Sequence, residues 1–158
     1  MQATRRTWLA GVCAGILLTF AGGAPEALGQ QGTALQIPQN AQIEPAALNK
    51  QLQGPAPGRP LLLQVGSKVL FGQAHIPGSE YVGAGAGEDA LVRRVARVPH
   101  GAAIAIYCGC CPWERCPNVY GAYEQLMKMG FTNVKVLYIA QNFGQDWVQK
   151  GYPVEQSH

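Results

Sequence analysis

Four of the five cysteines of this chain lie close together, at positions 108, 110, 111 and 116. They follow a short apolar run at residues 102–107 and precede a run in which apolar side chains recur at helical spacing. A thiol in a tight loop before a helix faces converging backbone N–H groups and the positive end of the helix dipole, which stabilise the thiolate. Since the thiolate is the form of sulfur that attacks, we expect Cys108 to be a nucleophile that is open to small reactants.

The elements around these cysteines place them at one edge of a sheet. Residues 102–107 are predicted to form a buried strand, and residues 118–129 a helix with Asn118 as its N-cap and Gly130 as its stop. The remaining pattern predicts strands at 61–65, 80–82 and 134–139 and helices at 45–52, 88–98 and 145–150. Strands that alternate with helices form a parallel sheet with helices on both faces. Ligands bind such sheets beyond the carboxyl ends of the strands, which is where residues 108–116, the cysteine loop, lie.

The beginning of the chain is typical of an export signal. Arg5 and Arg6 precede an apolar stretch at residues 8–20, and small residues at 27–29 offer a cleavage site before Gln30. The stretch is shorter than the roughly 20 residues that a membrane-spanning helix needs, so we expect membrane contact only through an uncleaved signal. The arginine pair is also similar to a twin-arginine signal. We therefore predict a periplasmic or secreted protein.

The rest of the chain is long enough for one domain. We predict an export signal peptide at residues 1–29, a flexible polar leader at 30–42 and a single domain at 43–156. Charged residues make up 13% of the chain and no basic run is interleaved with aromatic residues, so we expect no nucleic-acid partner. The clustered cysteines lie too close together to staple distant segments, which favours redox, sulfur or metal chemistry.

Several segments, in their order along the chain, together resemble the rhodanese-like (sulfurtransferase) domain. They are residues 61–65, the turn His75-Ile76-Pro77-Gly78, Cys108 after a buried strand, Gly130-Phe131-Thr132-Asn133-Val134, and Lys150-Gly151-Tyr152-Pro153. The resemblance covers about residues 43–156. It implies an α/β fold, a three-layer domain with a central parallel sheet flanked by helices, which agrees with the pattern of strands and helices.

The resemblance also implies roles for residues of the cysteine loop. Cys108 would take a sulfane sulfur from a small donor, thiosulfate or a persulfide, and pass it as a persulfide to a thiol acceptor. Backbone amides of the following loop, beginning at Gly109, would cradle the sulfur. Independently of the resemblance, the charge of Arg115 suits either an anionic donor or an ion pair with Glu114 or contact with solvent, and Trp113 is suited either to cover the pocket or to pack on its own loop. No cofactor is expected.

Two features depart from the usual pattern of these domains. Rhodanese-like domains often carry Asp-Val-Arg at the end of the second strand, where this chain has Gln64-Val65-Gly66. Their loop after the nucleophile has about five residues, whereas this loop is longer and holds three further cysteines. The departures bear on activity more than on fold.

The further thiols Cys110, Cys111 and Cys116 allow three interpretations. Cys111 or Cys116 is a resolving thiol that attacks a persulfide or mixed disulfide on Cys108. Alternatively two of them form a structural disulfide, for which the adjacent pair Cys110 and Cys111 has the least suitable geometry. In the third interpretation all four bind a soft metal such as Cu(I) or Zn²⁺. Because the cluster lacks the two separated ligand pairs of ordinary zinc sites, we predict no metal.

These observations lead to one functional hypothesis and its alternatives. We expect an exported sulfurtransferase-like protein that moves sulfane sulfur through Cys108. One alternative is a non-catalytic rhodanese-like module that binds a metal or a partner through the cysteine loop. Another is a thiol-disulfide oxidoreductase, suggested by the spacing Cys108-x-x-Cys111, which would need a redox partner protein.

Overall fold

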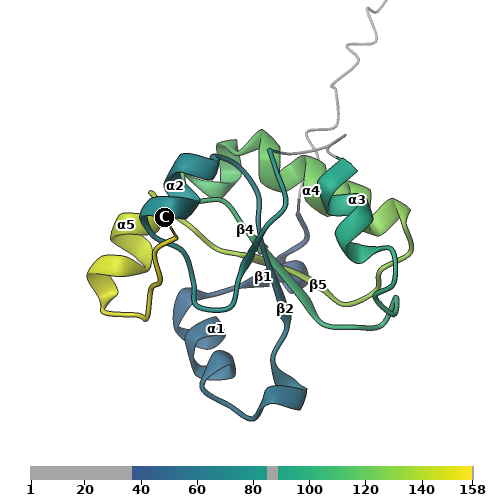
Figure 1. Ribbon diagram of the computed structural model, residues 1–158, viewed down its shortest axis with the longest axis horizontal. Coiled ribbons are helices and arrows are strands. Elements are labelled where there is room, and N and C mark those ends of the chain that lie inside the picture. The colour runs from purple at the N-terminus through teal and green to yellow at the C-terminus, as the bar shows by residue number, and fades with distance from the viewer. Residues whose placement is uncertain (1–36, 85–88, 158) are drawn as a thin grey trace, which may run out of the picture. The chain divides into compact units, whose positions relative to one another are not determined.

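The structure is a computed structural model that describes residues 37–84 and 89–157. The predicted export signal and the first part of the predicted leader lie outside the described residues. Figure 1 shows the labelled helices and strands. Within the described ranges, no helix has both the length and the apolar character needed to cross a membrane.

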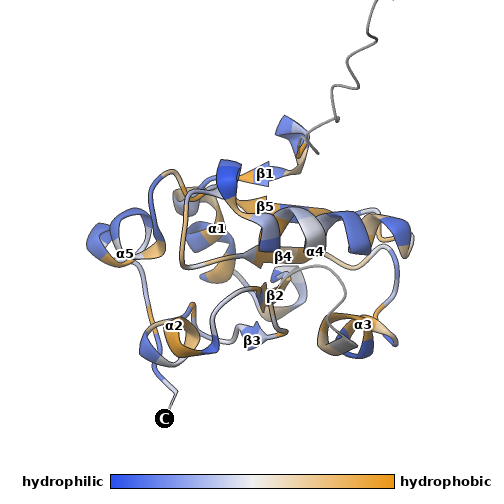
Figure 2. Ribbon diagram, turned by 90° about the horizontal axis from the view of Figure 1, so that it is seen from above, coloured by the Kyte–Doolittle hydropathy of each residue, from blue (hydrophilic) through white to orange (hydrophobic). Residues whose placement is uncertain are grey.

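In this part of the chain, five strands form one parallel sheet in the order β1-β5-β4-β2-β3. Their bounds are β1 (Gln42–Ile43), β2 (Leu61–Gln64), β3 (Glu80–Tyr81), β4 (Ile104–Tyr107) and β5 (Val134–Leu137). β4 lies at the centre and all of its residues are buried, as a strand covered on both faces requires. Figure 2 shows β4 and β5 in the orange of hydrophobic residues. The predicted parallel sheet is confirmed.

Helices pack on both faces of this sheet. Their bounds are α1 (Pro45–Leu52), α2 (Lys68–Gln73), α3 (Asp89–Val95), α4 (Pro117–Lys128) and α5 (Phe143–Asp146). Leu63 of β2 packs in one core with Leu91 of α3 and Leu126 of α4. The neighbouring Leu62 faces the opposite core with Leu48 of α1, because successive strand residues point to opposite faces. Figure 1 accordingly shows α3 and α4 on one side of the sheet and α1 on the other.

Helix α4 begins directly after the last cysteine. Cys116 is its N-cap and Pro117 its first residue, so the prediction of Asn118 as N-cap was wrong. Proline suits the first helical position because the N–H it lacks would have no partner there and its φ is already helical. The helix ends as predicted, with Gly130 after the C-cap at a φ of +86°. The earlier start places Cys116 at the helix N-terminus.

Two short elements were not predicted. Strand β1 pairs with β5, and Ile37 is buried, so residues 37–42 of the predicted leader belong to the folded domain. Helix α2 has only 6 residues, and its apolar residues Val69, Leu70 and Phe71 are consecutive, so no helical spacing marks it in the sequence. The predicted last helix at 145–150 is divided into α5 and a 3₁₀ turn at Val148–Lys150.

Candidate active site at the cysteine loop

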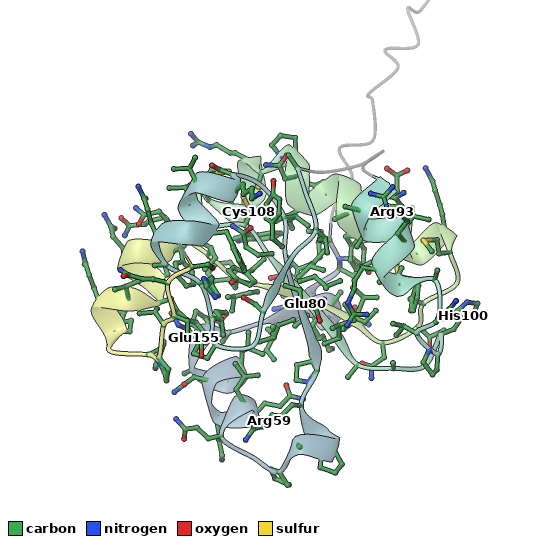
Figure 3. The ribbon with its side chains drawn as sticks, viewed as in Figure 1. Arg59, Glu80, Arg93, His100, Cys108 and Glu155 are labelled. Atoms are coloured by element: carbon green, nitrogen blue, oxygen red, sulfur yellow. The ribbon has the colours of Figure 1, made fainter. Side chains whose placement is uncertain are left out.

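Cys108 is the first residue after β4, at the carboxyl edge of the sheet. Figure 3 shows it at one end of the sheet and His100, which precedes β4, well away from it. The side chain is only 2% exposed and belongs to the core under α4. The expectation that this thiol is open to small reactants is therefore not met, since the cysteine loop covers it.

The structure brings the four predicted thiols together. Their sulfur atoms all lie within 4.8 Å of one another. The Cys108 Sγ is 3.1 Å from the Cys110 Sγ, which in turn is 3.2 Å from the Cys111 Sγ. All four are free thiols. Cys108 and Cys116 are buried, Cys111 is half-buried and Cys110 is exposed, so solvent meets the cluster at Cys110.

The neighbours of Cys108 favour its ionised form. The pKa of Cys108 is lowered to about 5, first because the Cys116 thiol donates a hydrogen bond to its sulfur. Burial opposes this, whereas the backbone N–H and thiol of Cys110 and the side-chain amide of Asn118 support it. The Asn118 Nδ2 lies 3.9 Å from the sulfur. Hydrogen bonds to a charged form stabilise that form, so Cys108 is the thiolate of the cluster at neutral pH.

The same contacts keep the neighbouring thiols protonated. The pKa of Cys116 is raised, first by its hydrogen bond to the Cys108 thiolate and then by burial. Burial, followed by the contact with Cys108, raises the pKa of Cys110 to about 12. One negative charge is thus shared by a group of sulfur atoms that lie close together. A single nucleophile surrounded by protonated thiols is the chemical character of this site.

Trp113 of the cysteine loop is half-buried and packs against the core, whereas Arg115 is exposed. The backbone N–H of Trp113 donates to the Ile139 carbonyl oxygen at 2.8 Å, and its ring centroid lies 5.5 Å from that of Tyr138. Trp113 therefore anchors the loop beside the end of β5, and its Nε1 is buried without a hydrogen-bond partner among the described residues. The exposed Arg115 side chain makes no hydrogen bond or ion pair within residues 37–84 and 89–157.

Comparison with solved structures identifies the fold. A rhodanese-like domain from Anabaena sp. superimposes with a TM-score of 0.55 at 20% identity, over 73% of this chain and 79% of that one. A protein from Bacillus halodurans gives 0.57 at 21% identity, over 73% and 77% of the two chains. Thiosulfate sulfurtransferase from Pseudomonas aeruginosa gives 0.53 at 19% identity, over 73% of this chain and 19% of that chain. The chain has the rhodanese-like fold. No family model and no curated protein matches the sequence.

Within this rhodanese-like fold, Gly66 is sterically tied to the nucleophile. Its φ is +124°, and a Cβ added to it would lie 2.8 Å from the Cys108 Sγ. No side chain fits at that distance while the sulfur keeps its place. Gly66 stands where rhodanese-like sequences often have the arginine of Asp-Val-Arg, so the structure gives a steric reason for this departure.

Gln64 and Tyr107 are site residues that the sequence did not reveal. Gln64 is 2% exposed, and its Oε1 has no hydrogen-bond partner among the described residues. Its Nε2 lies 3.7 Å from the position of a Cβ on Gly109, which places the amide under the start of the cysteine loop. Glutamine is rarely buried, so a glutamine inside the apolar run 61–65 is the sequence signal by which Gln64 could have been found.

Tyr107 joins β4 to the turn that begins at His75. Its hydroxyl oxygen accepts from the Ile76 N–H at 3.0 Å and lies 2.8 Å from the Ser79 Oγ. Burial raises the pKa of Tyr107 to about 12 despite these hydrogen bonds. The His75 Nδ1 lies 2.8 Å from the Phe71 carbonyl oxygen and fixes the other end of the turn. The residue next to the nucleophile is therefore held by a buried polar network.

Replacing Tyr107 with phenylalanine is expected to lower the free energy of unfolding by about 1–3 kcal/mol, because the Ile76 N–H and the Ser79 hydroxyl then remain buried without this partner. Urea unfolding followed by circular dichroism measures the change. Tyr123→Phe, on the half-buried side of α4, is the control and should cost less than about 0.5 kcal/mol. Equal effects of the two substitutions would contradict a stabilising role for the Tyr107 hydroxyl.

Proposed function

We propose that this protein moves sulfane sulfur through a persulfide on Cys108. The Cys108 thiolate attacks the outer sulfur of a donor such as thiosulfate, the S–S bond of the donor breaks, and sulfite leaves with the electron pair. A thiolate acceptor then attacks the outer sulfur of the persulfide, and Cys108 leaves as a thiolate. The sulfur passes from donor to acceptor while the protein returns to its starting state.

One observation carries this proposal, namely a stabilised thiolate at the carboxyl edge of a rhodanese-like fold. A pKa of about 5 keeps Cys108 ionised at neutral pH, and a weakly basic thiolate is also a good leaving group in the second step. One of the similar structures is a thiosulfate sulfurtransferase, which favours this class of reaction. Because Cys108 is buried, the proposal requires the cysteine loop to move when a donor enters.

The mass of the intact mature protein tests the proposal. Incubation of the reduced protein with thiosulfate should release one sulfite per chain and add one sulfur atom, which leaves the protein when a thiol attacks the persulfide. Cys108→Ser should take up no sulfur, whereas Cys111→Ser, which replaces a sulfur that lies 3.2 Å from that of Cys110, should still take up one sulfur atom. Absence of both sulfite release and a sulfur adduct in the wild-type protein, or either result in Cys108→Ser, would overturn the proposal.

Arg115 is proposed to attract an anionic donor to the cysteine loop. Arg115→Ala is expected to raise KM for thiosulfate about fivefold with little change in kcat, since an exposed ion pair contributes up to about 1 kcal/mol. Steady-state assays over a range of thiosulfate concentrations give both constants. Arg97→Ala removes the same charge from an exposed position elsewhere and is the control. A KM that changes equally in both variants would indicate a general charge effect rather than a binding role.

The proposal includes export of the protein. The basic, apolar and small-residue segments at 1–29 support a signal that is removed before Gln30 and a periplasmic or secreted location. N-terminal sequencing of the protein from the periplasmic fraction of a bacterial host checks this. A mature protein that still begins at Met1 and remains in the cytoplasm would contradict export.

A second candidate function is binding of a soft metal ion by the cysteine loop. The four sulfur atoms lie within 4.8 Å of one another. Around a tetrahedral zinc ion with Zn–S bonds of about 2.3 Å, neighbouring sulfur atoms are about 3.8 Å apart. The cluster thus needs only small shifts to hold Zn²⁺ or Cu(I), and thiolates select such soft ions. Thiol-disulfide oxidoreduction through Cys108 and Cys111 has less support, because the sulfur that lies 3.1 Å from that of Cys108 belongs to Cys110.

Metal content after anaerobic purification separates the two candidates. Stoichiometric copper or zinc that is lost in both Cys110→Ser and Cys116→Ser would favour the metal site. A metal-free protein that takes up one sulfur atom from thiosulfate would favour the persulfide. Metal content and sulfur uptake are measured independently, so a loss of metal binding is not mistaken for a loss of sulfur transfer.

A further inference from the structure

The cysteine loop places one thiol, that of Cys110, between the nucleophile and solvent. Its Sγ lies 3.1 Å from the Cys108 Sγ, and the Cys111 Sγ lies 3.2 Å from the Cys110 Sγ on its other side. Cys116 also contacts Cys108, but its side chain has no exposed surface. Cys110 is therefore the one thiol of the cluster that both contacts Cys108 and meets solvent.

We propose that Cys110 resolves the Cys108 persulfide and releases hydrogen sulfide, an inference that rests on the proposed function. The sulfur of Cys110 attacks the Cys108 Sγ, a Cys108–Cys110 disulfide forms, the bond to the outer sulfur breaks, and that sulfur leaves with the electron pair and the Cys110 proton. The sulfane sulfur is reduced by two electrons, and the two thiols are oxidised to the disulfide. An external dithiol reductant then restores both thiols.

The charge distribution of the site suits this order of events. With Cys108 ionised, the contact between the two sulfurs helps to keep the proton on Cys110. Once Cys108 carries the outer sulfur, its negative charge resides on that sulfur, so the Cys110 proton no longer stabilises an anion on the Cys108 Sγ. Transfer of the proton to the outer sulfur then activates Cys110 and prepares the leaving group together. This order places the attack by Cys110 after the transfer of sulfur to Cys108.

The exposure of Cys110 explains how the Cys108–Cys110 disulfide is reduced again. An external thiolate can reach the exposed sulfur of Cys110 but not the buried sulfur of Cys108 or Cys116. Attack at Cys110 expels Cys108, and the thiol with the lower pKa leaves faster. A disulfide to Cys116 would lack this exposed point of attack. The geometry thus favours Cys110, although the spacing alone pointed to Cys111 or Cys116.

The local backbone permits the bond. Residues two apart are separated by at most about 7 Å, and disulfides span Cα distances of about 4.4–6.8 Å. Gly109 lies between the two cysteines, and a side chain added there would meet its neighbours only at ordinary contact distances of 3.7 Å. The sulfur atoms need to approach by about 1 Å to reach the bond length of about 2.05 Å.

A single-turnover experiment tests the inference. The complete mature protein is first reduced and freed of reductant, and then mixed with thiosulfate. The sulfide that it releases is trapped, and its amount per chain is measured. The wild-type protein should release one sulfide per chain and lose two thiols. Cys110→Ser should keep the one-sulfur adduct and release sulfide about tenfold more slowly or not at all. Cys111→Ser, its neighbour in the same loop, should release sulfide at the wild-type rate.

Peptide mapping identifies the disulfide. Trypsin cleaves after Arg97 and Arg115, so Cys108, Cys110 and Cys111 share one peptide and Cys116 lies on the next. The inference expects the first peptide to be lighter by two hydrogen atoms in the wild-type protein and in Cys111→Ser, and unchanged in Cys110→Ser. A link between the two peptides, a persulfide mapped to Cys110, or a stable wild-type adduct without sulfide release would overturn it. Failure to load sulfur on both the wild type and Cys110→Ser would overturn the proposed function and this inference together.

Discussion

Cys116→Ala is expected to raise the pKa of Cys108 from about 5 toward the ordinary thiol value, because the thiol of Cys116 is the largest stabiliser of the Cys108 thiolate. A thiol with a pKa of about 8.5 is only about 1% ionised at about pH 6.5, so sulfur uptake there should fall by up to about 100-fold. The ultraviolet absorbance of the thiolate as a function of pH measures the shift directly. In the wild-type protein the thiolate should persist from neutral pH down to about pH 5.

Two further variants separate this effect from a loss of packing. Cys116→Ser retains a hydrogen-bond donor and should keep the pKa of Cys108 well below that of Cys116→Ala. Cys111→Ala removes a thiol that is not among the groups that shift Cys108 and should leave the titration unchanged. If the Cys108 thiol of Cys116→Ala titrates as in the wild-type protein, the Cys116 thiol does not stabilise the Cys108 thiolate.

Gly66→Ala is expected to abolish most sulfur uptake and to lower the free energy of unfolding by about 2–3 kcal/mol. A φ of +124° is unfavourable for alanine, and its Cβ would lie 2.8 Å from the Cys108 sulfur. The sulfur must then leave its position among the donors that keep it ionised. Urea unfolding and the intact mass after thiosulfate treatment give the two effects.

Gly151→Ala is the matched control for Gly66→Ala. Gly151 also has a positive φ, of +76°, but nothing lies within 4 Å of a Cβ added there. This variant should lose about 1 kcal/mol of stability through the backbone and still take up sulfur. Normal uptake by Gly66→Ala would show that the sulfur has room to adjust.

The sequence predicted the parts of the fold that depend on local hydrophobic patterns. Strand β4 and helix α1 are marked by apolar runs or stripes, and the bounds of α1 agree with the prediction. β1 has only two residues and is defined by its pairing with β5, which no local pattern specifies. The start of α4 was misplaced because Asn118 is a good cap in general, whereas Pro117 already fits the first turn.

The sequence indicated which cysteines form the candidate site, but not how their sulfur atoms are arranged. The cluster of cysteines after a buried strand was sufficient to single out Cys108. The spacing Cys108-x-x-Cys111 drew attention to Cys111, whereas the structure places the Cys110 sulfur 3.1 Å from that of Cys108. The burial of Cys108 and the polar network of Tyr107 depend on segments that are distant in sequence, and so they emerge only in the folded chain.

Gly66 lies so close to Cys108 that a side chain at position 66 and the Cys108 sulfur cannot occupy the same space. A descendant of this chain that acquired arginine at position 66 would have to relocate its thiol, and with it the contacts to Cys110 and Cys116. Substitutions at this strand end and in the cysteine loop are therefore expected to covary. An engineer who wishes to graft the loop onto another rhodanese-like scaffold would need to transfer the glycine with it.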